Sequence, residues 1–171
     1  YMAIDHNRQV VHIATPYDDV IIRLNAKLNN TYVSYGSLGR EKKAMQSAQD
    51  SNAAEMEAAV AVKRSVSKSS RLYKNSQWDL VDAVEDDEEI LSELVAEDLP
   101  QELQGKSESE IKSYVKAKKD EREKIQKEIQ ELNAKREVYI AEHQKEEKGE
   151  LENALLTAIK TQASKKNYKW D

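Results

Sequence analysis

One stretch, residues 107–147, constrains the fold of this chain more than any other. It contains neither Pro nor Gly, and most of its residues are straight-chain helix formers such as Lys, Glu, Gln and Arg. As a single helix it would be on the order of 60 Å long, at about 1.5 Å per residue. A helix of that length cannot be enclosed in a compact domain of 171 residues. We therefore expect other segments to pack along its apolar side.

The apolar side of this predicted helix follows a spacing of three and four residues. Its members are Ile111, Val115, Ile125, Ile129, Leu132 and Tyr139. The same spacing also selects four polar residues, which are Lys118, Arg122, Arg136 and His143. The pattern therefore predicts two apolar patches separated by a polar waist and packed within the chain. The six apolar residues are also the candidate contact surface for a second copy, which would make this helix a homodimerisation element.

A second stretch with helical periodicity covers residues 40–75. Its contact positions are mostly Ala and Val, so a partner helix could approach closely but would bury little apolar area per turn. We predict that helices 40–75 and 107–147 run antiparallel, with shorter helices around Trp78, Ile90 and Leu155 covering their ends. Lys148 and Gly149 are expected to interrupt the chain before the last of these, which would return along the central helix.

The N-terminal residues have a different pattern. A short apolar run at residues 1–4 and a β-branched run at residues 10–14 predict a small β-hairpin. Thr15 and Pro16 then open a helix, with Asp18 placed to reach back as a cap, and a Gly-containing loop follows near Gly36. The predicted fold is mainly α: an elongated helical bundle or long antiparallel helical hairpin with a small N-terminal β-hairpin. The predicted domain boundary separates residues 1–36 from residues 37–171.

Composition excludes several classes of function. Charged residues make up 35% of the chain with both signs interspersed and a net charge of −5, whereas a nucleic-acid-binding protein needs a basic stripe. There is no apolar run of about 18 residues, so no segment is predicted to span a membrane. Cysteine is absent, which excludes disulfides, thiol catalysis and zinc–thiolate sites from this chain.

No pattern of reactive side chains points to an enzyme. The three histidines, His6, His12 and His143, do not have the spacing of metal ligands. The acidic run 85–89 lacks the Gly and alternating oxygen ligands of a calcium loop, and it suits a solvated helix start. Asp18 and Asp19 could form an acid pair, but capping accounts for at least one of them. We assign no catalytic, cofactor or metal residue; an enzyme using Asp18, Asp19 or residues 85–89 is kept only as an alternative.

Four motifs together resemble a known protein family. They are Ile-Ala-Thr-Pro-Tyr-Asp-Asp at 13–19, Thr-Tyr-Val-Ser-Tyr-Gly at 31–36, Trp-Asp-Leu-Val-Asp-Ala at 78–83, and Ile-Gln-Glu-Leu-Asn-Ala-Lys-Arg at 129–136. In this order they resemble the C-terminal region of bacterial proteins that carry a von Willebrand factor type A domain. The resemblance covers most of the chain.

The resemblance implies that this chain is part of a longer protein and that its two parts have different roles. Residues 1–36 would be the last strands and helix of the type A domain, and residues 37–171 its helical extension. The family's Asp-x-Ser-x-Ser cation loop is absent from this sequence, so any divalent cation would bind upstream. The implied function is a non-enzymatic protein-interaction or scaffold module with an unidentified protein partner, associated with the rest of the type A domain or with a second copy. The implied location is the cell envelope or periplasm.

Overall fold

The computed structural model of the chain describes residues 13–165, with the side chains of 146–152 and 160–165 left out. This part of the chain is mainly helical and contains no β-strand beyond an isolated antiparallel bridge between Ser34 and Asp79. The helices are α1 (Asp18–Asn29), α2 (Gly39–Met56), α3 (Ala58–Lys68), α4 (Leu80–Asp86), α5 (Ile90–Glu93), the 3₁₀ turn Ala96–Asp98, and α6 (Glu108–Lys165). The predicted β-hairpin falls almost entirely on residues 1–12, which lie outside the described residues, and Ile13 and Ala14 have no regular structure.

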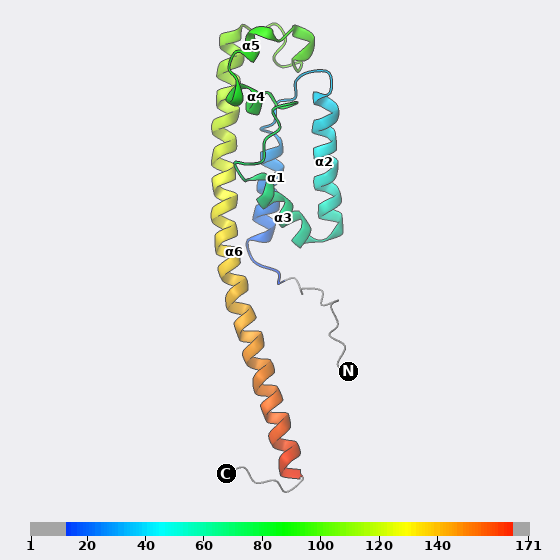
Figure 1. Cartoon of the computed structure of the whole chain (residues 1–171), viewed down its shortest axis with the longest axis vertical. Coiled ribbons are helices and arrows are strands. Elements are labelled where there is room, and N and C mark those ends of the chain that lie inside the picture. The colour runs from blue at the N-terminus through cyan, green and yellow to red at the C-terminus, as the bar shows by residue number, and fades with distance from the viewer. Residues whose placement is uncertain (1–12, 166–171) are drawn as a thin grey trace.

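Helix α6 forms one long side of the molecule, and the other helices lie along its first half (Figure 1). Its start carries a capping box: the Ser107 hydroxyl donates to a Glu110 carboxylate oxygen at 2.7 Å, and the Glu110 amide donates to the same hydroxyl at 3.4 Å. Helix α1 runs antiparallel to α6, because Thr31 just after α1 meets Arg122 whereas Asp18 at its start meets Arg136.

The prediction that the central helix ends near residue 147 is wrong, as is the prediction of a separate returning helix around Leu155. Helix α6 continues through Lys148 and Gly149 to Lys165. A Gly inside a helix costs only about 1 kcal/mol relative to Ala, and the helix-forming residues on both sides of Gly149 can offset this. Leu155 therefore lies on the same helix as Ile111.

The predicted single helix 40–75 is also corrected by the structure. It is divided at Glu57, whose backbone is extended with φ −161° and ψ 145°. Helix α3 then folds back along α2, so that Arg64 Nε lies 2.5 Å from an Asp50 carboxylate oxygen. Glu57 is a good helix former, so propensity gives no sign of this break. The helical hairpin of the structure is α2–α3, and it packs beside α1 (Figure 1).

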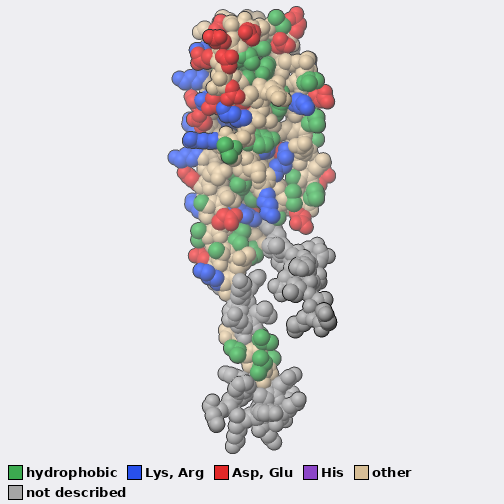
Figure 2. All heavy atoms as spheres, viewed as in Figure 1, with side chains coloured by type: hydrophobic (Ala, Val, Ile, Leu, Met, Phe, Trp, Pro, Cys, Tyr) green, Lys and Arg blue, Asp and Glu red, His purple; other side chains and the backbone are tan. Residues whose placement is uncertain are grey.

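Two apolar clusters form the core on opposite sides of the polar waist of α6. One joins α1, α3 and α6 around buried Ile21, Val62 and Ile129, with Trp78. The other joins the segments around Val33, Leu80 and Leu103 to the first turns of α6. The expected arrangement of two patches packed within the chain is thus confirmed in the described residues. Figure 2 shows that charged side chains of both signs are interspersed over the visible surface of this body.

Candidate functional site: a buried polar face of helix α6

The most concentrated polar site of the described chain surrounds Arg122, in the middle of α6. Its guanidinium is buried and Nη1 lies 2.7 Å from a carboxylate oxygen of both Asp79 and Asp82. Nε donates to the Thr31 hydroxyl at 3.0 Å, and Nη2 donates to the Thr31 carbonyl oxygen at 2.9 Å. The guanidinium also lies 4.3 Å from the centre of the Tyr32 ring. One arginine therefore ties α6 to two segments that are distant in sequence.

The two carboxylates are held by backbone groups as well as by Arg122. Asp79 accepts from the Val33 amide at 2.7 Å and caps α4 by accepting from the Asp82 amide at 3.2 Å. Asp82 accepts from the Asn75 amide at 2.7 Å. Burial, together with the neighbouring charge of Asp79, raises the pKa of Asp82 to about 6, against the opposing effect of Arg122. The Asp82 carboxyl is therefore the group of this cluster that can take up a proton in mildly acidic solution.

A second buried arginine lies fourteen residues further along α6. Arg136 Nε donates to Asp18 Oδ1 at 2.9 Å, and Thr15 donates to the same carboxylate through its hydroxyl at 2.6 Å. Burial alone would raise the pKa of Asp18, but the hydrogen bonds from Thr15 and Arg136 hold it below its ordinary value. The predicted contact of Asp18 back to Thr15 is present, since Asp18 also accepts from the Thr15 amide at 3.2 Å. The predicted helix start at Thr15 and Pro16 is wrong, because α1 begins at Asp18 with Tyr17 as its N-cap and has no side-chain cap hydrogen bond.

A third polar cluster holds the α2–α3 hairpin against α1. Lys68, although almost completely buried, donates to Asp50 at 2.6 Å and to the Asn29 side chain at 2.5 Å. Burial lowers the pKa of Lys68, while the hydrogen bonds from Lys68 and Asn29 keep the pKa of Asp50 low in spite of its burial. Two amide oxygens beside this cluster, Asn25 Oδ1 and Gln46 Oε1, are buried without a hydrogen-bond partner.

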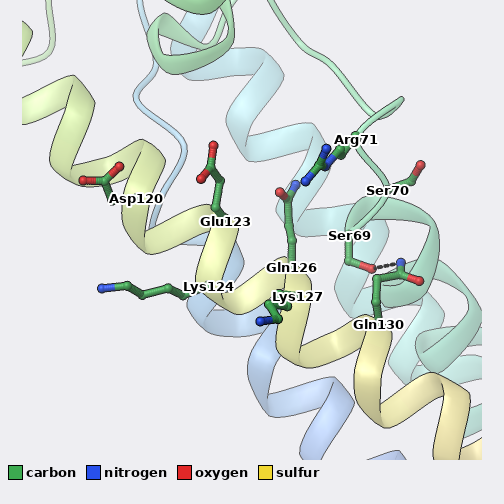
Figure 3. A pocket seen from close by; sticks show the side chains of 9 residues that line it. All are labelled: Ser69, Ser70, Arg71, Asp120, Glu123, Lys124, Gln126, Lys127 and Gln130. Atoms are coloured by element: carbon green, nitrogen blue, oxygen red, sulfur yellow. Dashed lines mark hydrogen bonds between the residues drawn. The ribbon is translucent and has the colours of Figure 1, made fainter.

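A hollow on the surface lies between α6 and the segment after α3 (Figure 3). Its volume is about 730 Å³, and its lining mixes cationic, anionic and neutral polar side chains. Gln130 donates to the Ser69 hydroxyl at 2.6 Å across its floor, while Lys124 points away from that contact. A smaller hollow of about 310 Å³ reaches Asp82 and Arg122. In the first hollow the Ser69 hydroxyl also donates to the Val66 carbonyl oxygen at 2.7 Å.

The six residues predicted as an interaction surface lie within the chain's own core or against it. Ile111, Val115, Ile125 and Ile129 are buried. Leu132 packs on the cluster that contains Ile125 and Ile129, and the Tyr139 ring meets the Tyr17 ring edge-on at 6.4 Å. Contact with a second copy through these residues would require the core to open.

The alternative acidic candidates are dispersed. Asp18 is buried in its ion pair, whereas Asp19 is exposed on the same turn. Within residues 85–89, Glu85 pairs with Lys119 at 3.2 Å and Glu88 pairs with Lys112 at 2.7 Å. In the described part of the chain, no three His, Asp or Glu side chains are grouped so that they could hold a metal ion. His143 stacks on Tyr139, while His6 and His12 lie outside the described residues.

Sequence reasoning missed the clusters because their signals are spread along the chain. Arg122 and Arg136 were identified only as interruptions of an apolar stripe, yet their spacing places them on its buried face. Their partners come from motifs that the resemblance had already singled out, at 13–19, 31–36 and 78–83. The position of each arginine on the stripe is the signal that the sequence carries, but by itself it does not distinguish a buried arginine from an exposed one.

Beyond Tyr139, α6 continues for more than six turns as a projecting segment, defined here as residues 142–165 (Figure 1). All described side chains in 153–159 are exposed, including Leu155, Leu156 and Ile159. Figure 2 shows apolar side chains on this projecting end. No helix in the described residues has the length and apolarity needed to cross a membrane.

Comparison of the chain with known protein families, with curated proteins and with solved structures finds no match.

Proposed function

We propose that the chain is a non-enzymatic protein-interaction module, in which a helical body supports α6 and α6 presents its projecting segment to a partner. The observation that carries this proposal is the exposure of Leu155, Leu156 and Ile159 on a helix that extends beyond the body. Exposed apolar side chains gathered on one element are typical of a contact surface. The buried ion pairs of Arg122 and Arg136 support the body's role, because they attach α6 to the other segments at two separate points.

In this proposal the molecule acts as an elongated helical bundle attached to a larger protein. The resemblance to proteins with a von Willebrand factor type A domain supplies the larger context: residues 1–36 would be the end of that domain, and residues 37–171 would be its helical extension. A divalent cation would then belong to the upstream part, and the chain would contribute protein contacts. The alternative of self-association through Ile111 and Ile129 has less support, because both side chains are buried in this body.

The proposal is tested by affinity capture with the full-length protein in three forms. One form ends at residue 141, one is unchanged, and one carries Leu72→Glu on an exposed loop of the body, where Leu72 is 93% exposed. We expect the first form to lose proteins that the other two retain, whether these are other proteins or a second tagged copy. Equal capture by all three forms would show that the projecting segment is not a contact surface.

A further inference from the structure

We propose that the projecting segment of α6, residues 142–165, pairs antiparallel with the same segment of a second copy of this chain. This inference rests on the proposed function and names the partner. The contact between the two copies would then lie outside the core. The apolar residues around Ile111 and Ile129 are already packed within the chain.

The first argument is the state of the apolar side chains. Leu155 is 61% exposed, Leu156 54% and Ile159 43%, and they lie within little more than one turn of helix. Leu155 and Ile159 are four residues apart and so share one face. Tyr139 still contacts the body through the Tyr17 ring, whereas His143, one turn later, stacks on Tyr139 of its own helix. Most of the stability of a helix in a protein comes from packing of its apolar face, so a partner along this face would stabilise the segment.

The second argument is the order of charges along the segment, which selects both the partner and its direction. Residues 142–152 contain five Glu and two Lys, whereas residues 153–165 contain two Lys and no acidic residue. When two copies align antiparallel about Leu155, the acidic stretch of each lies opposite the basic stretch of the other. A parallel alignment places the acidic stretches side by side. Complementary charge of this kind sets the orientation and specificity of a helical pair more than its strength.

The length of the segment also suits this pairing. At about 1.5 Å per residue it extends on the order of 36 Å. An antiparallel overlap of two such segments would hold the two bodies at opposite ends of the pair. Neither body would then obstruct the other. In a parallel pair both bodies would lie at the same end, side by side.

Sedimentation equilibrium of the whole chain between about 1 and 100 μM tests the pairing. We expect a monomer–dimer equilibrium for the unchanged chain. The double substitution Leu155→Glu with Ile159→Glu should weaken it by at least about tenfold, whereas Leu72→Glu on the body should change it by less than about twofold. Circular dichroism should show the same unfolding midpoint of the body in all three, because the side chains of Leu155 and Ile159 are exposed on the projecting segment.

A monomer throughout this range would overturn the inference, and so would a dimer that the double substitution leaves intact. If the chain stays monomeric but the segment still captures another protein, the inference fails while the proposed function stands. If no protein is captured through the segment, the proposed function fails as well.

The direction of pairing is tested with single cysteines, since the chain has none of its own. Gln144→Cys and Gln162→Cys lie near the two ends of the segment. With a short bis-maleimide, we expect the mixture of the two variants to give cross-linked heterodimer and each variant alone to give little. Strong cross-linking of each variant with itself would indicate parallel strands and would refute the antiparallel arrangement.

Discussion

Replacing Arg122 with Met should strongly destabilise the body. The substitution keeps an apolar stem of similar length but removes the guanidinium, which makes two ion pairs and two hydrogen bonds to Thr31. Asp79 and Asp82 would remain buried beside each other without a cation. Breaking a buried ion pair by removing one partner typically costs about 3–5 kcal/mol. That is a large share of the roughly 5–15 kcal/mol that stabilises an ordinary domain.

The destabilisation should also depend on pH in a defined direction. Without the guanidinium, the pKa of the Asp82 carboxyl rises further, so its protonation relieves part of the penalty in acid. We therefore expect the cost of Arg122→Met to be greater at pH 8 than at pH 5. Urea unfolding followed by circular dichroism and by the fluorescence of buried Trp78 measures the free energy of unfolding at each pH.

Two further variants make this prediction refutable. Arg71→Met removes an exposed arginine near the large hollow and should change the free energy of unfolding by less than about 0.5 kcal/mol. The triple variant Arg122→Met, Asp79→Asn, Asp82→Asn should be more stable than Arg122→Met alone, because it removes the unpaired charges. If Arg122→Met costs less than about 1 kcal/mol, or if the triple variant is the least stable, the cluster does not hold the body together as argued.

Three other predictions address separate parts of the molecule. Since the folded-state pKa of Asp82 is raised to about 6 from 3.8, its contribution to stability is present below about pH 4 and is lost as the pH rises through 6. Asp82→Asn should therefore flatten the pH dependence of unfolding between pH 4 and 6 by on the order of 2–3 kcal/mol, and an unchanged slope in urea titrations would contradict this. Lys68→Met should cost about 1–3 kcal/mol in the same assay, less than Arg122→Met because Arg64 still pairs with Asp50; a cost equal to that of Arg122→Met would show that Arg64 does not compensate. Gly149→Ala should stabilise the projecting helix locally by about 1 kcal/mol, seen as slower amide exchange in residues 142–165 with the body unaffected; equal protection in both proteins would mean that Gly149 does not limit this helix.

The parts of the fold that were predictable from sequence are those set by local pattern. The start of α6 at the Ser107 cap, its unbroken course through the six apolar positions and the packing of its stripe inside the chain all follow from residues close together in sequence. The turn at Glu57 does not, because nothing at that residue disfavours a helix. It forms because folding α3 back buries Val62 and brings Lys68 to Asp50, and these contacts are visible only in three dimensions.

The prediction that the helix ends near residue 147 was wrong for the opposite reason: here a local signal was present but weak. Lys148 and Gly149 carry a local signal for a break, but a single Gly is a weak signal beside the helix formers around it. The buried ion pairs of the candidate site were not predicted, for a third reason. Arg122 and Arg136 interrupt an apolar stripe, and sequence alone does not distinguish an exposed interruption from a buried ion whose partner lies 40 to 118 residues away.

The two buried arginines give the body something that its apolar contacts alone do not provide, namely a single register. Arg122 and Arg136 are fourteen residues apart on α6, about 21 Å, and their partners Thr31 and Asp18 lie at opposite ends of α1. Apolar side chains such as Ile125 and Ile129 could pack almost as well after α1 slides by one turn, about 5.4 Å. The same slide would separate both arginines from their partners and leave buried charges unpaired, which is far more costly than a small loss of packing. The interruptions of the apolar stripe therefore align α1 with α6, and that alignment determines how much of α6 the body covers and how much extends beyond it.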